Sequence, residues 1–411
     1  MASRKRSNTP AAPRDKLGVW IFGAMGGLST TMIVGARAIA KGKVGTQGLL
    51  TETPGLSKIG LQGVPGLVFG GHEIRDGSIV EAAEEIYENT GTIPYPLLRS
   101  LKTDLTRIDK NVRRGCLVNA GKTILRMAGR SPSSTTLKTE VVRLKKDIRD
   151  FMRRNKLKRC VCVNLTSTEP KLKITRQHET RKGFEKIIAD NKTTAVRPSA
   201  IYSYVAASLG LPFIHFTPSN AALIGGIRET FDDTGAPYMG SDGKTGETLV
   251  KSSLAPMFKY RNLQVLTWQG YNILGDRDGV VLADHENKSS KVESKDLLLS
   301  KILGYPLHTH VGIDYVPSLN DLKTAWDFIH FQGFLGYKMS MQFTWQGCDA
   351  ILAAPIVLDM VRLADLAKRR GDTGPMKHLS CFFKKPLDVT QHDLHLQWHL
   401  MTDYVRSVEE G

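Results

Sequence analysis

The sequence predicts an α/β fold in which a nucleotide-binding domain is interrupted by a second, α+β domain. An apolar run, a glycine-rich turn and an amphipathic segment follow one another within the first 40 residues. The composition changes after residue 241, and strong helical periodicity returns after residue 348. With 411 residues, of which 41% are hydrophobic and 24% charged, the chain is long enough for two domains and apolar enough to fill their cores.

The first strand is expected over 16–22, an apolar run that stops at Gly23. Gly26 and Gly27 follow, and small residues at helical spacing predict a helix over 30–40. Such glycines let backbone N–H groups approach a pyrophosphate, and the helix N-terminus adds partial positive charge. This order predicts the opening of a dinucleotide-binding domain of the Rossmann type. Because the spacing is G-x-x-G-G, an ordinary strand-to-helix turn is the alternative.

Further strands of the same sheet are expected over 64–70 and 159–164. Glu73 follows the first, where a carboxylate can accept hydrogen bonds from the ribose hydroxyls of a dinucleotide. The second leads into a hydroxyl-rich loop with Thr166 and Ser167, where a nucleotide can meet the sheet edge. The remaining expected elements are a helix over 200–209, a strand over 212–217 and a long helix from Asp349.

These elements divide the chain into four parts. We expect a basic flexible tail over 1–16, a nucleotide-binding domain over 17–242, a second α+β domain over 243–348, and a return to the first domain over 349–411. The tail has no apolar stretch of the signal-peptide type, and no run reaches the roughly 18–20 apolar residues of a membrane span. A soluble, non-secreted protein without a membrane partner is therefore expected.

The charge is strongly positive and unevenly distributed. The chain has 57 Lys and Arg against 40 Asp and Glu, a net +17, and residues 101–190 hold 24 of the basic and nine of the acidic groups. Basic runs in this segment suit the solvated face of a helix at least as well as a phosphate-binding groove. Because Phe151 and Phe184 are its only aromatic residues, specific nucleic-acid binding is not expected. A polyanion-binding protein that uses this segment remains an alternative.

Metal catalysis is not expected from the cysteines and histidines. The five cysteines form no C-x-x-C pair, which favours reduced thiols in the cytoplasm. The groups His308-Thr-His310 and His392, His395 and His399 have spacings compatible with metal ligation, but neither belongs to an H-E-x-x-H motif. The G-K-T of residues 243–245 lacks the earlier glycine of a P-loop, which excludes that kind of ATPase.

Lysines and hydroxyl groups are the stronger candidates. The segment 240–248 precedes a helix-like run, and its N-terminus could hold a phosphate or could be a turn with nothing bound. Asp276-Arg-Asp278-Gly is a tight turn or a cation loop without the glutamate of an EF-hand. Lys291 and Lys295 are four apart, so on a helix they would repel unless they share an anion. Lys323 and Lys384 border apolar segments, where a lysine can serve in proton transfer.

An ordered set of segments resembles the myo-inositol-1-phosphate synthase family, in its shorter archaeal and bacterial form. The segments are GAMGGLSTT, GGHEI, NLTSTEP, FTPSN, GSDGKTGETLVKSSLAPMF, YNILGDRDG, SKVESK, DYVPSLNDLKTAWDF, CDAILAAP and FFKKPLD, and they run from Leu17 to Asp388. The resemblance implies an NAD-dependent isomerase that converts glucose 6-phosphate to inositol phosphate without net redox change. Carbon 5 is oxidised, an enolate forms, aldol closure makes the ring, and the ketone is reduced again.

The resemblance also implies site residues. Catalytic residues would be Lys291, Lys295, Lys323, Lys384, Asp242 and Asp278. Cofactor-binding residues would be Gly23, Ala24, Gly26, Gly27, Glu73, Thr166, Ser167, Asp242, Thr245 and Asp349. Substrate-binding residues would be Thr245, Asn272, Leu274 and the same four lysines. Longer eukaryotic members carry an asparagine-bearing loop in place of residues 25–29 and a serine in place of Thr245, and neither difference removes a group that the mechanism needs.

Further expectations come with the family. They are a homotetramer formed through the sheet of the second domain, a divalent metal or monovalent cation near the cofactor phosphates, a cytoplasmic location, and the first step of inositol and inositol phospholipid biosynthesis. Two enzymatic alternatives remain, a related cyclase for another sugar phosphate and an ordinary dehydrogenase that releases NADH.

Overall fold

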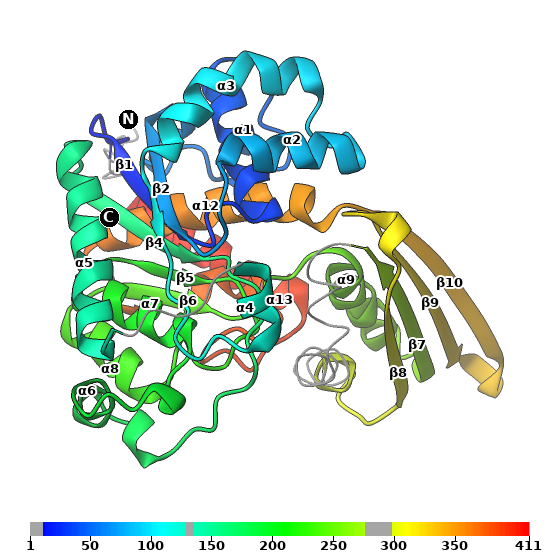
Figure 1. The fold of residues 1–411 in the computed structure, drawn as a ribbon. Helices are drawn as coiled ribbons and strands as arrows, with labels where there is room; N and C mark the ends of the chain where they lie inside the picture. Colours follow the sequence, from blue (N-terminus) through cyan, green and yellow to red (C-terminus); the bar gives the residue numbers. More distant parts are fainter. Residues whose placement is uncertain (1–10, 129–134, 276–297, 411) are drawn as a thin grey trace, which may run out of the picture.

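The structure is a computed structural model and describes residues 11–128, 135–275 and 298–410. Two sheets organise these residues: a seven-stranded parallel sheet with helices on both faces and a four-stranded mixed sheet (Figure 1). All four strands of the second sheet lie between two strands of the first in the sequence. The predicted α/β class with an inserted second sheet is confirmed.

The larger sheet has the strand order β3-β2-β1-β4-β5-β6-β11. Its strands are β1 (Leu17–Phe22), β2 (Leu67–Glu73), β3 (Val112–Arg114), β4 (Arg159–Asn164), β5 (Phe213–His215), β6 (Pro237–Gly240) and β11 (Gly374–Pro375). The first six follow the order of a Rossmann-type domain, in which the direction of strand addition reverses between β1 and β4. The carboxyl ends of β1 and β4 therefore flank a natural ligand crevice.

Alternate residues of β1 fill two separate cores. Val19 and Ile21 face one core, and Trp20 and Phe22 face the other. Helices on the first side are α1 (Gly27–Ala40), α2 (Ile79–Thr90), α3 (Tyr95–Asp109) and α12 (Asp349–Arg370). Helices on the second side are α5 (Leu137–Arg154), α6 (Arg181–Ala189), α7 (Pro198–Ser208) and α8 (Gly225–Asp233). A short helix, α4 (Lys122–Ala128), lies outside both layers with a small core of its own.

Element boundaries differ from those expected where a special residue intervenes. The strand expected over 64–70 starts only at Leu67, because Pro65 lies in a 3₁₀ turn, and it continues to Glu73. The first helix begins at Gly27, three residues earlier than its apolar pattern indicates. The strand over 159–164 lies where it was predicted.

The second sheet has the order β10-β9-β7-β8. Its strands are β7 (Gln264–Leu274), β8 (His308–Tyr315), β9 (Lys323–Gln332) and β10 (Lys338–Gly347). Helix α9 (Gly246–Tyr260) and the helical residues 298–303 share a core with one face of this sheet. On the other face, Tyr271, Trp326 and Phe328 are exposed. The domain boundaries at 242/243 and 348/349 stay a prediction.

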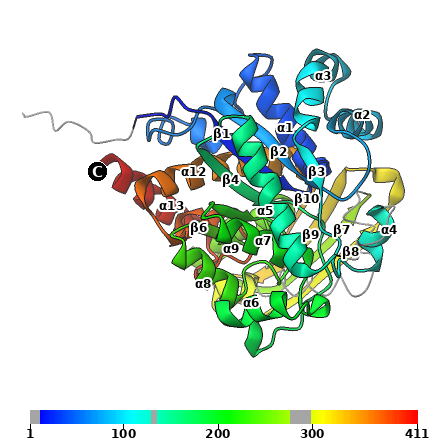
Figure 2. The same ribbon diagram turned by 60° about the vertical axis from the view of Figure 1, so that its left-hand side comes forward.

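Helix α12 carries the chain back to the larger sheet. It begins directly after β10 and packs along α1 (Figure 1 and Figure 2). A 3₁₀ segment over Lys377–Phe382 follows, and the last helix, α13 (Leu394–Glu410), packs on that segment and on α9. This return places the segment with Lys384 beside the end of β6, since Leu387 N donates to Gly240 O at 2.8 Å.

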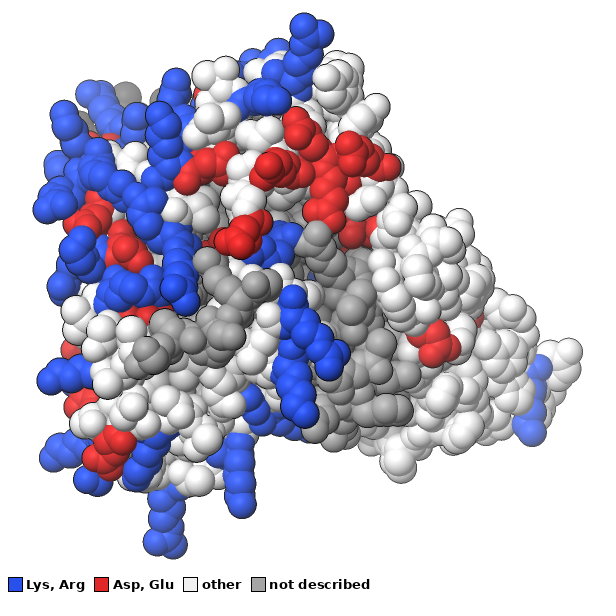
Figure 3. Space-filling model, in the orientation of Figure 1, with Lys and Arg blue, Asp and Glu red and all other residues white. Residues whose placement is uncertain are grey.

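The basic segment 101–190 contains two strands of the larger sheet, β3 and β4, and helices α5 and α6 on one of its faces. Figure 3 shows Lys and Arg side chains gathered over the side where α5 lies in Figure 1. Helix α5 buries Ile148 and Phe151 and exposes Lys146 and Arg153, which form ion pairs with Asp150 at 2.6 and 2.8 Å. Most of these charges therefore belong to a solvated helix face. Within the described ranges, no helix has the length and apolar character that crossing a bilayer requires.

Candidate active site

A cavity of about 480 Å³ opens where the carboxyl ends of the larger sheet face the second sheet. Predicted site residues in its lining are Gly23, Gly26, Gly27, Glu73, Thr166, Ser167, Asp242, Thr245, Asn272, Leu274, Lys323, Asp349 and Lys384. Ala24 is buried beside the lining. Asp278, Lys291 and Lys295 lie outside the described residues. One cavity therefore collects residues from both sheets and from α12.

The glycine turn brings the start of α1 to the lining of the cavity. Gly23 has a φ of +88°, and a Cβ there would lie 3.0 Å from Leu165 O, so both its conformation and its surroundings favour glycine. Gly23 N and Ala24 N donate to His72 O at 2.9 and 3.1 Å. Gly26 is the N-cap of α1 and supplies no side-chain cap. The first amides of this 14-residue helix therefore face the cavity side without a protein cap, as a phosphate site requires.

Glu73 holds this turn in place. Its carboxylate accepts hydrogen bonds from Met25 N at 2.7 Å, Ile74 N at 2.8 Å and Arg75 N at 3.1 Å. The Arg75 guanidinium donates to Met25 O and lines the cavity. The sequence predicts a ribose acceptor at Glu73. The structure adds that the same carboxylate organises the glycine turn, which a motif alone does not indicate.

Two lysine–aspartate pairs also line the cavity. Lys323 Nζ lies 3.2 Å from Asp349 Oδ2, and Lys384 Nζ lies 2.9 Å from Asp242 Oδ1. Lys323 opens β9 and Asp349 opens α12, whereas Asp242 follows β6. Thr245 Oγ1 donates to Asp349 Oδ1 at 3.2 Å. Both cations thus face the cavity with their charge partly balanced by a fixed carboxylate.

Asp242 is the most constrained of these groups. Its φ is +62°, its N–H donates to Thr217 O at 3.1 Å, and its carbonyl accepts from Lys384 N at 2.7 Å. Asp242 Oδ2 and Thr217 Oγ1 are buried and have no hydrogen-bond partner among the described residues. Because leaving a buried polar atom unpaired costs about 1–3 kcal/mol, this corner of the cavity is suited to a ligand with polar groups.

A third carboxylate, Asp321, was not anticipated from the sequence. It lines the cavity close to the start of α1. A Cβ built on Gly27 would lie 3.8 Å from Asp321 Oδ2. Burial raises the pKa of Asp321. The residue lies two positions before Lys323 in a segment that carries the family resemblance, which is the signal that could have identified it. Among the described residues, no three His, Cys, Asp or Glu side chains group closely enough to form a metal site by themselves.

Glu169 is a buried acid in the lining of the cavity. It accepts a hydrogen bond from Ser199 N at 2.8 Å and a second from Ser199 Oγ, which fixes the first turn of α7. The backbone N–H of Glu169 donates a hydrogen bond to Ser219 Oγ at 3.1 Å. Burial raises the pKa of Glu169 to about 7. Its loop, NLTSTEP, was predicted to approach a nucleotide, but the buried acid itself was missed.

The remaining candidates have different roles. Asn272 is fully buried and Leu274 nearly so, and both line the cavity from β7. Lys244, the lysine of G-K-T, is also buried, but its Nζ donates to Gln397 Oε1 at 2.7 Å in α13. Burial lowers the pKa of Lys244 to about 8. Lys244 therefore ties the site to the C-terminal helix and does not line the cavity.

Comparisons with known proteins agree with this geometry. A family model for NAD binding, described as myo-inositol-1-phosphate synthase, matches residues 17–406. The inositol-3-phosphate synthase 1 of Bacteroides thetaiotaomicron is 33% identical over 98% of this chain and 97% of its own length. The synthase of rice (Oryza sativa subsp. japonica) is 29% identical over 57% of this chain and 48% of its own length.

Solved structures show the same fold. The inositol-3-phosphate synthase of Caenorhabditis elegans has a TM-score of 0.86 at 20% identity, covering 96% of this chain and 86% of that one. A myo-inositol-1-phosphate synthase-related protein of Thermotoga maritima has a TM-score of 0.76 at 19% identity, covering 95% of this chain and 98% of that one. Together with the family match over most of the sequence, these findings lead to one conclusion: the chain belongs to the myo-inositol-1-phosphate synthase family.

Proposed function

We propose that the chain catalyses the NAD-dependent isomerisation of glucose 6-phosphate to 1D-myo-inositol 3-phosphate, without net redox change. The observation that carries this proposal is a single cavity lined both by the uncapped N-terminus of α1 and by two lysine–aspartate pairs. An oxidation, an enolisation and an aldol closure at one sugar require a dinucleotide site and fixed cations within a single pocket. The family membership supports the same reaction.

The described residues fit NAD. Gly23, Gly26 and Gly27 would accommodate its pyrophosphate at the start of α1, and Glu73 would meet a ribose. The unpaired oxygens of Asp242 and Thr217 would accept the polar groups of the nicotinamide end. When bound, NAD supplies the oxidation that begins the reaction and the reduction that completes it. Thr166, Ser167, Thr245 and Asp349 also line the cavity and are further candidates for contact with NAD.

Lys384 and Asp242 are proposed to move the proton of the hydroxyl group at carbon 5. Their 2.9 Å contact lets the carboxylate hold the ammonium in one orientation while that ammonium faces the sugar oxygen. Lys323, oriented by Asp349, is proposed to stabilise the negative oxygen of the enolate and of the aldol step or to bind phosphate. The N-terminus of α9 after Thr245, with Asn272 and Leu274, would complete the substrate pocket.

Three further residues keep the roles that the resemblance implies. Lys291 is proposed to share the proton movement at carbon 5, Lys295 to share the stabilisation of the enolate, and Asp278 to act beside them. A cation is proposed near the cofactor phosphates, with Asp321 as its protein neighbour. A carboxylate so close to the start of α1 would repel a pyrophosphate unless a cation screens it. A divalent and a monovalent ion both satisfy that requirement.

A homotetramer, formed through the second sheet, is part of the proposal. The exposed face of that sheet carries Tyr271, Trp326 and Phe328 at 44%, 43% and 39% exposure, more apolar surface than an isolated sheet usually presents to water. We also propose a cytoplasmic location and a place at the first step of inositol and inositol phospholipid biosynthesis.

A balance of product against NADH tests the reaction. The purified chain would be incubated with glucose 6-phosphate and NAD⁺ at about one hundredth of the substrate concentration. Inositol phosphate, measured by ion chromatography, is expected to exceed the NAD⁺ present many times, with no rise in NADH absorbance. NADH that accumulates in proportion to sugar consumed would identify an ordinary dehydrogenase. Turnover of another sugar phosphate alone would identify a related cyclase.

A further inference from the structure

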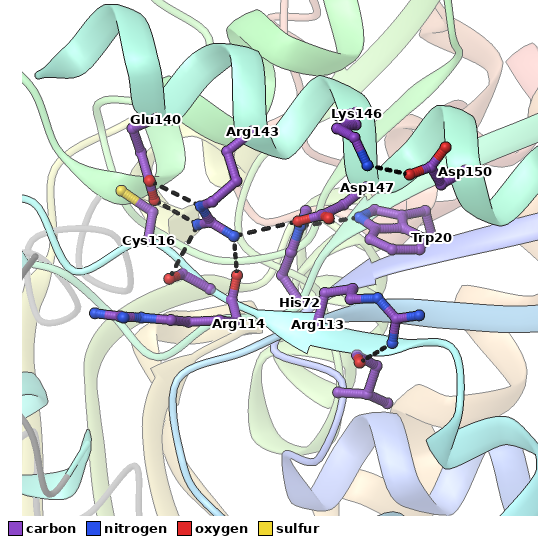
Figure 4. Close-up of polar contacts among 12 residues, drawn as sticks. Trp20, His72, Arg113, Arg114, Cys116, Glu140, Arg143, Lys146, Asp147 and Asp150 are labelled. Atoms are coloured by element: carbon purple, nitrogen blue, oxygen red, sulfur yellow. Dashed lines mark hydrogen bonds and ion pairs between the residues drawn. The ribbon is translucent and has the colours of Figure 1, made fainter. Parts of the chain in front are cut away.

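We propose that Asp147 and Arg143, on helix α5 outside the cavity, are positioning residues for the dinucleotide. They act through the buried ring of His72, whose backbone and chain neighbour hold the glycine turn (Figure 4). The inference rests on the proposed NAD-dependent function. It adds to that function two side chains of the basic segment, for which the family resemblance supplies no role.

The hydrogen bonds of His72 assign its protonation. Trp20 Nε1 donates to His72 Nδ1 at 3.0 Å, and an indole N–H can only donate. His72 Nδ1 therefore carries no proton, and Nε2, which lies 3.2 Å from Asp147 Oδ2, is the donor to that carboxylate. The ring is fully buried, and burial lowers the pKa of His72, which agrees with a neutral imidazole. Asp147 thus selects one tautomer and one ring orientation.

Arg143 in turn fixes Asp147. Its Nη1 donates to Asp147 Oδ2 at 3.2 Å, while Nε and Nη2 form a two-point contact with Glu140 at 2.9 and 2.6 Å. A further bond from Nη1 reaches Arg114 O at 2.7 Å, at the end of β3. Figure 4 shows Arg143 at the centre of these contacts, between α5 and the strand edge. The network therefore connects one helix to β1, β2 and β3.

His72 passes this constraint to the glycine turn. Its carbonyl accepts both Gly23 N and Ala24 N, and the next residue, Glu73, accepts Met25 N. Its ring is stacked on Phe22 and Tyr202 with an interplanar angle of 13° in each case. A ring that lost its acceptor at Nε2 would be a buried donor without a partner, and it would tilt toward a new one. Such a tilt would displace the carbonyl that aligns the turn, and small misplacements of binding groups weaken recognition.

The experiment compares three variants of the full chain by isothermal titration with NAD⁺. Asp147→Ala removes the acceptor and should raise the Kd for NAD⁺ about tenfold. Asp147→Asn keeps an oxygen for the Nε2–H and should stay within about threefold of the unaltered chain. Asp150→Ala is the matched control, because Asp150 lies on the same helix and its carboxylate pairs with Lys146 and Arg153 at the surface. It should leave the Kd unchanged.

A purely structural role would give a different pattern. The proposal expects kcat at saturating NAD⁺ and the KM for glucose 6-phosphate to stay within about twofold in Asp147→Ala, since the lysine–aspartate pairs line the cavity and α5 is not part of its described lining. It also expects a nitrogen-15 NMR spectrum of the unaltered chain with the proton of His72 on Nε2. Unaltered NAD⁺ affinity in folded Asp147→Ala would overturn the inference, as would a His72 proton on Nδ1.

Two other outcomes are also decisive. Equal losses of NAD⁺ affinity in Asp147→Ala and Asp147→Asn, in proportion to the fall in their melting temperatures, would show that the network only stabilises the fold. That result would overturn the inference. Failure of the unaltered chain to bind NAD⁺ at all would instead overturn the proposed function on which the inference rests. The NMR measurement needs no variant, so it can overturn the inference even if Asp147→Ala does not fold.

Discussion

At the scale of single residues, the cavity depends on partners that are distant in the sequence. Lys323 and Lys384 could be selected from the sequence because their segments resemble a known family. Their pairing with Asp349 and Asp242 could not, since 26 and 142 residues separate the partners and only the packed fold brings them together. The role of Glu169 was missed for the same reason, because a buried carboxylate is recognisable only by what surrounds it.

Asp242→Asn tests the role of the paired carboxylate. The amide keeps the shape but removes the charge that orients Lys384, so kcat should fall about 100-fold or more. Asp388→Asn is the matched control, because Asp388 pairs with Arg228 away from the cavity and should leave kcat within about twofold. Steady-state product formation checks both, and an Asp242→Asn enzyme with nearly normal kcat would contradict the assigned role.

Glu169→Gln tests the buried acid through the pH dependence of stability. The folded state holds this proton up to about pH 7, whereas the ordinary pKa is 4.5. Between these pH values the unfolded chain has lost a proton that the folded chain keeps. The contribution of Glu169 to the free energy of unfolding therefore becomes less favourable as the pH rises. When the pH is lowered from about 8 to 5, the free energy of unfolding of the unaltered chain should rise by up to about 3 kcal/mol relative to that of the Gln variant.

Urea unfolding of both proteins at several pH values measures this difference. Other acids whose pKa is raised by burial, such as Asp327 and Asp359 at about 6, are present in both chains and cancel in the comparison. A stability difference that does not change with pH would show that Glu169 is ionised in the folded protein and would refute the prediction.

At the scale of elements, local chemistry determined what could be predicted. The strand over 159–164 and the strand–turn–helix at the start of the chain were recognisable because alternation, glycines and helical periodicity are local signals. The bounds of β2 differ from those expected because its start follows Pro65 and its last residues pair with β1 and β3, where His72 aligns with Phe22 and Glu73 with Arg114. The tertiary pairing therefore extends the strand beyond its apolar run.

Gly23→Ala tests the glycine turn as an element. A φ of +88° costs a non-glycine residue about 1 kcal/mol or more, and the added Cβ would lie 3.0 Å from a backbone oxygen that cannot move away easily. The melting temperature should fall by several degrees and the NAD⁺ Kd should rise about tenfold or more. Gly42→Ala is the control, because Gly42 also has a positive φ but has open space where a Cβ would be. This substitution should lower stability without changing the Kd for NAD⁺. Equal effects on NAD⁺ affinity would contradict this account of the turn.

At the scale of the whole molecule, two sheets of different construction meet at one cavity. Sequence composition could indicate the insertion, but it could not show that β7 and β9 deliver Asn272 and Lys323 to the same space as the glycine turn. It also could not show that α12 and the segment after it return beside β6. Those juxtapositions depend on the packing of segments that are hundreds of residues apart.

Trp326→Asp tests the proposed assembly through the exposed face of the second sheet. A charge in the middle of an apolar interface is costly to desolvate, so the variant should dissociate to smaller species in size-exclusion chromatography with light scattering. Ile174→Asp is the control, since Ile174 is similarly exposed, at 45%, on a loop of the other sheet's domain. A variant that keeps the mass of the unaltered protein would place the interface elsewhere.

The most direct test of the central claim is a phosphorus NMR time course with glucose 6-phosphate and a catalytic amount of NAD⁺, run in parallel on the unaltered chain and on Lys323→Ala. The account predicts that the unaltered chain converts the sugar phosphate to inositol phosphate without accumulating NADH. It also predicts that Lys323→Ala binds NAD⁺ but gives no product. Absence of conversion by a chain that demonstrably binds NAD⁺, or full conversion by Lys323→Ala, would contradict it.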